Sequence, residues 1–334
     1  MAGILVTGGA GYIGSHVVRQ LGERGEEPVV LDNLSSGFPE AVLAGQLVVG
    51  DAGDKQLVHR LLREHQVDTV MHFAAHTVVP ESVSDPLKYY GNNTACTLNL
   101  LQACSKAGIP HFVFSSSAAV YGPASDTPIC EDHPTHPVTP YGTSKLMSEW
   151  MLQDAAGAGG PRHAILRYFN VAGCDPQCRI GQSTPEATLL IKVACEAAAG
   201  SRRGVSIFGT DYPTPDGTGI RDFIHVEDLA DAHLRALDHL REGGSSLTVN
   251  AGYGHGYSVR EVLQAVERVS GQKLETFETD RRPGDLAQVV AAADRIRFQL
   301  GWQPRYDDLD FIVETALAWE QRCAQAKSPA CSTG

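Results

Sequence analysis

The segment Thr7-Gly8-Gly9-Ala10-Gly11-Tyr12-Ile13-Gly14 joins a short apolar run to a helical pattern near the start of the chain. Its glycines at positions 8, 11 and 14 follow a G-x-x-G-x-x-G spacing. Glycine lets the backbone turn tightly, and it lets a pyrophosphate approach the free N–H groups at the start of a helix. The segment therefore predicts a strand, a phosphate-binding turn and a helix, which is how a dinucleotide-binding fold begins.

An acidic residue at the end of the next apolar run supports this interpretation. Asp32 closes that run and is followed by Asn33 rather than by an arginine. A carboxylate at this place hydrogen-bonds the adenosine ribose diol and repels a 2′-phosphate, so we expect NAD rather than NADP. Asp51, after the third apolar run, is placed to reach the adenine amino group.

The first half of the chain alternates apolar runs with helical patterns. The runs that we expect to be strands cover residues 4–7, 28–31, 47–49, 69–72, 112–115 and 164–168. The helical patterns cover residues 13–24, 55–65, 92–107 and 141–155. Continuous apolar runs are typical of strands buried on both faces, and their alternation with helices predicts an α/β, doubly wound parallel sheet of Rossmann-like type. The ligands of such a sheet bind at the C-terminal ends of its strands.

The alternation weakens after Asn170, where the chain becomes rich in Gly, Pro and Asp. We expect helices at 188–199, at 258–270 with Ser258 as the N-cap, and at 308–321. The division predicts an NAD-binding domain of residues 1–170 plus about 222–252. A smaller α/β substrate-binding domain would comprise 171–221 plus 253–323, and residues 324–334 would be a flexible tail.

The composition is that of a globular protein. The chain has 334 residues, 43% of them hydrophobic, and a formal net charge of −12. Because an acidic surface repels phosphate backbones and anionic lipids, we expect neither a nucleic acid nor a membrane as a partner. The sequence contains no long apolar span and no signal-peptide pattern. Its eight cysteines lack the spacing of a zinc site, so we expect no bound metal. We expect the cysteines to be reduced thiols in a cytoplasmic protein.

A second motif carries acid–base chemistry. Tyr141 and Lys145 are four residues apart in a helical pattern that follows Pro140, so their side chains share one face. A tyrosine is a poor base at neutral pH, but a neighbouring ammonium group and a cationic nicotinamide ring both favour its phenolate. Ser117, in the serine cluster after the strand at 112–115, is placed to hydrogen-bond the same substrate hydroxyl that Tyr141 would deprotonate.

Ser117, Tyr141 and Lys145, together with the glycine pattern, resemble the extended branch of the short-chain dehydrogenase/reductase superfamily. Within that branch the chain is similar to the UDP-galactose (UDP-glucose) 4-epimerase family. The similar segments occur in the family's order and extend over almost the whole chain. The similar segments are residues 7–15, 31–34, 72–74, 115–122, 166–170, 207–219, 220–233 and 281–285.

The resemblance implies the reversible 4-epimerisation of UDP-hexoses through a 4-keto intermediate. Tyr141 would remove the proton of the sugar 4-hydroxyl while NAD takes the C4 hydride, which then returns to the other face of the turned sugar. Lys145 would be the electrostatic partner of Tyr141 and would anchor the nicotinamide ribose, and Ser117 would relay the proton.

The resemblance also implies two sets of binding residues. The residues expected at NAD are Gly8, Gly11, Tyr12, Ile13, Gly14, Asp32, Asn33, Leu34, Ser35, Ser36, Gly37, Asp51, Ala52, Phe73, Ala74, Ala75, Asn92, Ser115, Tyr141, Lys145 and Phe169. The residues expected at the UDP-sugar are Ser117, Tyr141, Asn170, Leu189, Leu190, Ile207, Phe208, Arg221, Arg282, Asp285 and Val289. The two arginines suit a pyrophosphate inside an acidic protein, although Arg221 beside Asp222 is also compatible with a surface salt bridge.

Three positions depart from the family pattern. Thr77 stands where several relatives have Lys, Leu189 where others have Asn or His, and Lys192 where others have Pro. These departures concern one NAD contact and one nucleotide contact, whereas the Ser-Tyr-Lys set is intact. We expect His72 and His225 to be structural.

The resemblance also bears on the choice of sugar. Val289 lies four residues after Asp285, at the position that faces the sugar C2 substituent in this family. Relatives restricted to plain hexoses carry a bulky Tyr there, so a Val leaves room for an acetamido group. We therefore expect UDP-GlcNAc and UDP-GalNAc to be substrates as well, unless a shifted backbone closes the space.

Other functions remain possible on the same fold. A sugar-nucleotide 4,6-dehydratase begins with the same oxidation, but it needs an acid and a base after the position of Ser117, where this chain has Ala118 and Ala119. A dehydrogenase that releases NADH and a non-catalytic NAD-sensing scaffold are the further alternatives. Relatives commonly form homodimers through two helices per subunit, and the candidates are residues 92–107 and 141–155.

Overall fold

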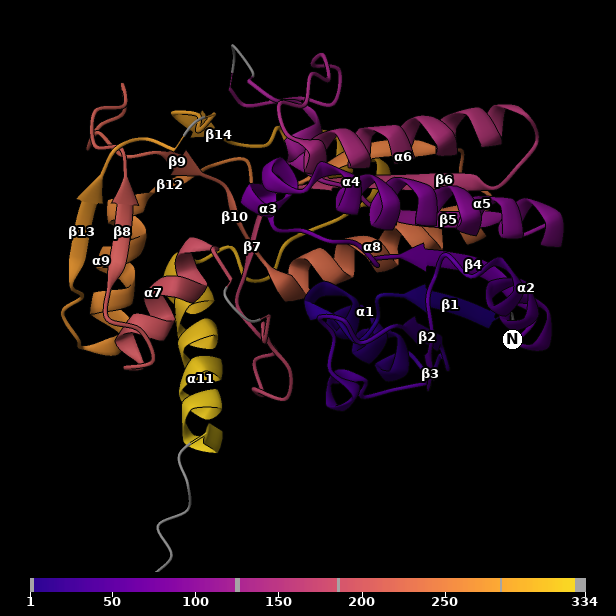
Figure 1. Cartoon of the computed structure of the whole chain (residues 1–334), viewed down its shortest axis with the longest axis horizontal. Coiled ribbons are helices and arrows are strands. Elements are labelled where there is room, and N and C mark those ends of the chain that lie inside the picture. The colour runs from indigo at the N-terminus through magenta and orange to yellow at the C-terminus, as the bar shows by residue number, and fades with distance from the viewer. Residues whose placement is uncertain (1–2, 124–126, 185–186, 283, 328–334) are drawn as a thin grey trace, which may run out of the picture.

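The computed structural model describes residues 3–123, 127–184, 187–282 and 284–327. Its centre is a seven-stranded sheet in which every neighbouring pair of strands is parallel (Figure 1). In spatial order its strands are β11 (Leu247–Ala251), β6 (Arg162–Tyr168), β5 (His111–Ser115), β4 (Val67–His72), β1 (Gly3–Thr7), β2 (Val29–Asp32) and β3 (Gln46–Val49). The doubly wound parallel sheet predicted from the alternating pattern is confirmed.

Two helical layers bury the sheet, and this explains its continuous apolar strands. One apolar core lies under α1 (Tyr12–Glu23) and α8 (Val226–Arg241), and it reaches Ile4 and Val6 of β1. The other core contains Leu5 of the same strand. It lies under three helices: α2 (Lys55–Glu64), α5 (Cys96–Ala107) and α6 (Pro140–Gly157). Successive side chains of β1 thus enter opposite cores, as the pleat of a strand requires.

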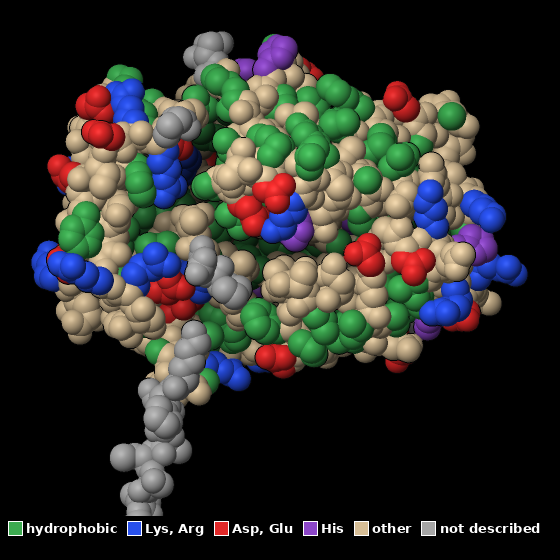
Figure 2. Space-filling model, viewed as in Figure 1, with side chains coloured by type: hydrophobic (Ala, Val, Ile, Leu, Met, Phe, Trp, Pro, Cys, Tyr) green, Lys and Arg blue, Asp and Glu red, His purple; other side chains and the backbone are tan. Residues whose placement is uncertain are grey.

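A smaller α/β part packs beside the C-terminal ends of the central strands (Figure 1). Its helices are α7 (Leu190–Ala198), α9 (Val259–Ser270) and α11 (Leu309–Lys327). Its strands are β8 (Val205–Phe208) with β13 (Thr276–Thr279), and β12 (Tyr257–Ser258), β9 (Ile220–Arg221) and β14 (Gln288–Val289). The strand pair β7 (Asn170–Ala172) and β10 (Phe223–His225) lies between the two parts. Figure 2 shows the surface hollowed where they meet.

The remaining elements are short. They are η1 (Pro39–Ala41), α3 (Val79–Ser84), α4 (Pro86–Tyr89), η2 (Tyr90–Ala95), η3 (Ala118–Val120) and α10 (Asp294–Leu300). Hydrophobic side chains gather on the face that carries α3, α4 and α6 (Figure 2). In the described part of the chain, no helix is both long and apolar enough to cross a membrane.

Two expected elements differ from the structure. The helix expected at 92–107 begins instead with η2, a wide π turn, and becomes α-helical only at Cys96. The wide turn buries Asn93, whose amide bonds the backbone of His76 and the hydroxyl of Ser144. The flexible tail was expected to begin at residue 324, but α11 continues to Lys327 because these residues are good helix formers. Residues 328–334 lie outside the described part.

Candidate active site

The glycine turn has the backbone that its spacing predicts. Gly8 has a φ of +73°, and a Cβ there would lie 2.4 Å from the backbone nitrogen of Ala74, two residues after the end of β4. A Cβ on Gly14 would lie 2.3 Å from the Gly8 carbonyl oxygen, so helix α1 packs directly on the turn. Gly11 begins α1 with no side-chain cap, and a Cβ there would meet only the Gly8 oxygen, at 3.3 Å. The start of the helix is therefore open to an anion.

The residues that we expect to bind the adenosine lie together at the ends of β2 and β3. Asp32 is buried, and its carboxylate accepts hydrogen bonds from the N–H groups of Ala10 at 2.9 Å and Leu34 at 2.8 Å. Asp51 accepts from the Gly53 N–H at 2.6 Å and lies 3.5 Å from the Asn33 amide. The Asp32 carboxylate thus lies beside the glycine turn, and the Asp51 carboxylate lies next to Asn33, the residue after Asp32. The other expected residues of this region are Ser35 and Ser36, which are exposed, and Gly37 and Ala52, which are buried.

Other residues expected at NAD come from strand ends nearby. The N–H groups of Phe73 and Ala74 both donate to the Thr7 carbonyl, at 2.9 and 3.1 Å, so the chain after β4 runs beside the glycine turn. Ala75 follows them and is half-buried. Asn92 lies in the wide turn η2 and bonds Asn93.

Two further NAD residues are placed by tertiary contacts. The hydroxyl of Tyr12 donates to the Gly173 carbonyl at 2.6 Å, so this side chain is tied to the loop after β7. Ile13 packs partly buried against the core under α1.

Tyr141 and Lys145 lie on the first two turns of α6 and are both buried. The helix begins as predicted, with Pro140 in its first turn, and the hydroxyl of the N-cap Thr139 accepts from the Gly142 N–H at 3.2 Å. The Lys145 ammonium donates to the Ser115 carbonyl at 2.9 Å and lies 5.0 Å from the ring centroid of Phe114. Ser117, Tyr141 and Lys145 therefore lie together at the C-terminal end of β5.

Burial pushes both groups toward their neutral forms. It raises the pKa of Tyr141 well above its usual range, and the hydrogen bond with the Ser117 hydroxyl opposes this shift. Burial lowers the pKa of Lys145 to about 8, and the charge of Glu149 opposes that shift. Ser117 also accepts from the Ala119 N–H at 3.2 Å, which fixes it at the start of η3.

Several of the residues that we expect to bind the UDP-sugar come from β8, from β9 and from the segment between β13 and β14. The Arg282 guanidinium lies 3.7 Å from the ring centroid of Phe208 at the end of β8, one residue after Ile207. Arg221 on β9 forms an ion pair with Asp285 at 3.3 Å. Two cations thus lie among the residues expected to hold a diphosphate.

Val289 joins this set to the catalytic side. On β14 it pairs with Arg221 of β9, and it packs against an apolar cluster that contains Val120 and Phe169. Phe169 directly precedes Asn170, whose N–H donates to the Asp222 carbonyl at 3.0 Å. The position expected to face the sugar therefore lies near η3, which follows Ser117.

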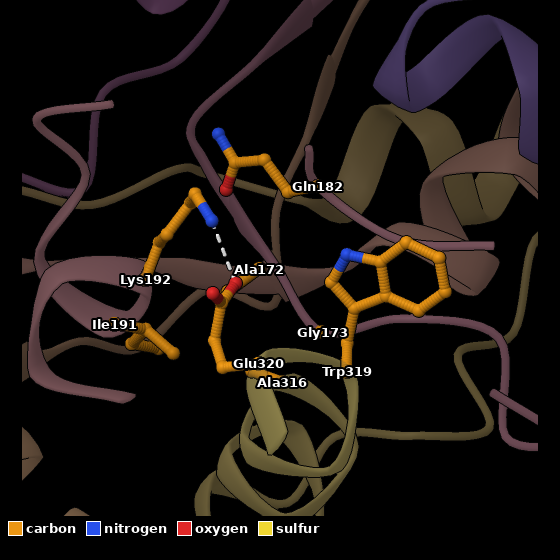
Figure 3. Close-up of a pocket in the computed structure, with 8 residues that line it drawn as sticks. All are labelled: Ala172, Gly173, Gln182, Ile191, Lys192, Ala316, Trp319 and Glu320. Carbon is orange, nitrogen blue, oxygen red and sulfur yellow. Dashed lines mark hydrogen bonds and ion pairs between the residues drawn. The ribbon is translucent and has the colours of Figure 1, made fainter. Parts of the chain in front are cut away.

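The departures from the family pattern have different surroundings. Leu189 is the N-cap of α7 and is 36% exposed, and Leu190 is partly buried. Lys192 is buried, and its ammonium bonds Glu320 of α11 at 2.6 Å (Figure 3). It also forms an ion pair with Glu196 at 3.2 Å. Its charge is therefore satisfied by two carboxylates. Thr77 is exposed.

Sequence reasoning missed two residues of this region. Asn93 hydrogen-bonds Ser144, the residue before Lys145, and so holds the turn before α5 in place. In the sequence, only the Gly91-Asn92-Asn93 run at the start of the expected helix pointed to it. Tyr212 is buried, and its ring lies 4.2 Å from the Arg281 guanidinium. Its hydroxyl has no hydrogen-bond partner among the described residues.

His72 and His225 are both buried and hydrogen-bonded. His72 is buried between the hydroxyls of Thr7 at 2.6 Å and Thr97 at 2.9 Å, and burial lowers its pKa to about 3. His225 is buried at the N-cap of α8, where burial lowers its pKa to about 3. Six of the described cysteines form no disulfide: Cys96, Cys104, Cys130, Cys174, Cys178 and Cys195. Within the described ranges, no group of His, Cys, Asp and Glu is arranged to hold a metal ion.

Known proteins of similar sequence and structure agree on one family. Residues 4–252 match the NAD dependent epimerase/dehydratase family. The UDP-glucose 4-epimerase of Azospirillum brasilense is 59% identical over 332 residues, which cover 99% of this chain and 95% of that protein. The UDP-glucose 4-epimerase of Rhizobium meliloti is 48% identical over 319 residues, which cover 96% and 97%.

Solved structures give the same result. The UDP-glucose 4-epimerase from Brucella ovis in complex with NAD has a TM-score of 0.94 at 43% identity, over 96% of this chain and 99% of that one. The UDP-Glc/GlcNAc 4-epimerase from Campylobacter jejuni has a TM-score of 0.85 at 48% identity, over 97% and 100%. The family expected from the sequence is thereby confirmed, and the chain belongs to the UDP-glucose 4-epimerases of the NAD dependent epimerase/dehydratase family.

Proposed function

We propose that this protein catalyses the reversible 4-epimerisation of UDP-hexoses with NAD as its bound cofactor. One observation carries the proposal: Tyr141, Lys145 and Ser117 gather at the end of β5, on the same edge of the sheet as the glycine turn. The open start of α1 and the carboxylate of Asp32 fit the pyrophosphate and ribose of a dinucleotide. When bound, NAD would supply a reversible hydride acceptor for the sugar C4.

The residues of the chain supply the proton chemistry. Tyr141 accepts the proton of the sugar 4-hydroxyl and later returns it, and Ser117 orients that hydroxyl through its bond to the tyrosine. The Lys145 ammonium stabilises the phenolate, because opposite charges in a buried site attract strongly. Arg221 and Arg282 bind the diphosphate of the nucleotide, and they leave the sugar ring free to turn between the two hydride transfers.

A dehydratase reaction needs a group that the described part of the site lacks. A 4,6-dehydratase would need a proton donor directly after Ser117, where η3 presents Ala118 and Ala119. We therefore assign no elimination step to this protein.

We infer that UDP-N-acetylhexosamines are accepted as well. Val289 is half-buried beside Arg221, and its short apolar side chain leaves space for an acetamido group at the sugar C2. One of the similar solved structures is a UDP-Glc/GlcNAc 4-epimerase, which supports this substrate range.

The test is turnover without added cofactor. Purified protein is incubated separately with UDP-glucose, UDP-galactose, UDP-GlcNAc and UDP-GalNAc, and the nucleotide sugars are then separated by chromatography. We expect each substrate to give a mixture with its C4 epimer and no net NADH. Stoichiometric NADH or a dehydrated 4-keto sugar would contradict the proposal.

We also propose that the protein is a cytoplasmic homodimer built from two units. The β11 strand of the segment 222–252 completes the central sheet beside β6, which supports joining this segment to 1–170 as the NAD-binding unit. Residues 171–221 plus 253–323 then form the sugar-binding unit. Free thiols suit the reducing cytoplasm.

Exposed apolar side chains on α5 and α6 support the dimer. Leu98 is 42% exposed and Trp150 is 52% exposed. Charge placed in such a face should separate the subunits, so Leu98→Glu is expected to elute as a monomer in size-exclusion chromatography with light scattering. Phe298→Ser is the matched control, because Phe298 is 89% exposed on α10 instead. A monomeric wild type would contradict the dimer.

A further inference from the structure

Glu149 lies at the centre of a buried polar cluster beside Lys145. It follows Lys145 by one turn of α6 and is completely buried. Its Oε1 accepts a hydrogen bond from the Ser116 hydroxyl at 2.5 Å. Arg167 of β6 donates from Nε to both carboxylate oxygens, at 3.1 and 3.2 Å, and from Nη2 to Oε2 at 2.6 Å. The proposed reaction makes no direct use of this carboxylate.

The far side of the cluster is equally well fixed. Arg167 donates from Nη1 to the Tyr121 hydroxyl at 3.0 Å, and its guanidinium lies 4.9 Å from the centroid of that ring. The Tyr121 hydroxyl in turn donates to the Asn250 amide oxygen at 2.7 Å. Residues of β6 and β11, together with Ser116 just after β5 and Tyr121 just after η3, therefore hold the Glu149 carboxylate in a single position. Such extensive hydrogen bonding offsets the high cost of burying a charge.

The surroundings of Lys145 explain what this carboxylate does. Lys145 contacts the Ser115 carbonyl and the Phe114 ring of β5. It interacts electrostatically with Glu149 of α6 and with His72 of β4. Arg167 of β6 bonds Glu149, and Tyr168 of β6 interacts electrostatically with Tyr141, one turn before Lys145 on α6. His72 is neutral, because burial and the Lys145 charge lower its pKa to about 3. Glu149 is the negative charge in this described set.

We propose that Glu149 is a positioning residue that keeps Lys145 in its ammonium form, so that Lys145 can stabilise the Tyr141 phenolate during turnover. This inference rests on the proposed function. Its geometric basis is the i, i+4 spacing on α6, which places the carboxylate and the ammonium on one face of the helix. Ser116 and Arg167 act through Glu149 by fixing its carboxylate.

The sign of the effect follows from charge. Burial lowers the pKa of Lys145 to about 8, and the negative charge of Glu149 opposes this shift. Without Glu149 the pKa falls further, and Lys145 loses its proton at a lower pH. Because the ammonium supports the phenolate, the alkaline limb of the kcat profile must move to lower pH. Loss of Arg167 removes a positive charge instead, so the limb must move to higher pH.

The first experiment compares variants of opposite charge effect. We expect Glu149→Gln to move the alkaline limb of kcat down by about 1 pH unit or more, the usual size of such a charge effect. Arg167→Gln should move it up, and Ser116→Ala, which changes no charge, should leave its position within a few tenths of a unit. A purely structural role would lower activity in the first two variants without moving the limb. An unshifted limb in Glu149→Gln overturns the proposal.

A second measurement needs no turnover. The chain has seven lysines, so carbon-13 labelling at lysine Cε gives a simple NMR spectrum in which Lys145 is identified by its loss in Lys145→Met. Arg167→Met is compared with Glu149→Gln/Arg167→Met, because these differ only at Glu149 and replacing a buried pair as a whole is usually tolerated. We expect the pKa of Lys145 to be lower in the double variant. Equal values overturn the proposal even if the wild type proves to have no epimerase activity, which would refute only the proposed function.

Discussion

Replacing Val289 by Tyr should change the choice of sugar. Val289 is half-buried on β14, and it packs toward Val120, which is 0% exposed, and Phe169, which is 8% exposed. These neighbours leave little room on the protein side, so an added phenol ring must extend toward the substrate. Overpacking typically costs ~1–3 kcal/mol. Because each ~1.4 kcal/mol corresponds to a factor of ten, kcat/KM for UDP-GlcNAc and UDP-GalNAc should fall roughly 5- to 150-fold.

The assay follows epimer formation from all four UDP-sugars with wild type and variant. Plain hexoses carry only a hydroxyl at C2, so their kcat/KM should change less than about threefold, which is within the range of a minor repacking. Gln288→Tyr is the matched control, because Gln288 is exposed and its side chain leaves the other face of the same strand. Equal losses on both pairs of substrates, or a wild type inert toward the N-acetylated pair, would refute the reasoning.

Further predictions concern the base, the cofactor, the α7–α11 ion pair and acid stability. Tyr141→Phe keeps the ring but removes the proton acceptor, so kcat should fall about 10²–10⁴-fold; turnover within threefold of wild type would rule out the role of Tyr141. Acid-denatured protein should release NAD(H) and not NADP(H), as measured by chromatography, because the buried Asp32 carboxylate repels a 2′-phosphate. Lys192→Met leaves the carboxylates of Glu196 and Glu320 without their shared cation, so urea unfolding should show a loss of about 3–5 kcal/mol, whereas Lys273→Met on the surface should cost little. Burial lowers the pKa of five histidines to between about 3 and about 4: His16, His72, His163, His225 and His233. Each takes up its proton near pH 6.5 only when unfolded, so the free energy of unfolding is intact above pH 6.5 and should fall by up to about 1.4 kcal/mol per pH unit per histidine as the pH drops toward 4; a flat stability profile over that window would contradict these shifts.

Local patterns in the sequence predict the fold because they are decided over a few residues. The spacing of Gly8, Gly11 and Gly14 specifies a tight turn, and in the structure a Cβ at Gly8 or Gly14 would clash with backbone atoms. The N-cap at Ser258 is equally local, and its capping box with Glu261 is complete. Apolar runs of three to five residues likewise indicated strands, and most of these strands are buried, since few other structures bury both faces of a short segment. The run at 47–49 is the exception, because it forms the edge strand β3, where Val49 is 64% exposed.

Contacts between distant residues could not be predicted in the same way. Lys192 meets Glu320 across 128 positions of sequence, so its departure from the family pattern gave no hint of an ion pair. The stacking of Arg282 on Phe208 and the tie between Tyr12 and Gly173 are of the same kind. The wide turn η2 depends on the side-chain bonds of Asn93 to His76 and Ser144, and these partners become neighbours only after the sheet has formed.

The burial of Tyr141 and Lys145 sets the acid–base chemistry of the site. Taken alone, it disfavours both the Tyr141 phenolate and the Lys145 ammonium, because each charged form loses its hydration. Formed together, however, the two charges stabilise each other in a medium that screens them poorly. On the proposed mechanism a substrate proton is therefore accepted only when Lys145 is protonated, and we propose that Glu149 keeps it protonated. A cationic nicotinamide ring beside the phenolate would add to this effect. We therefore expect Tyr141 to remain a neutral phenol in the unliganded protein and to become a base only when the cofactor site is filled.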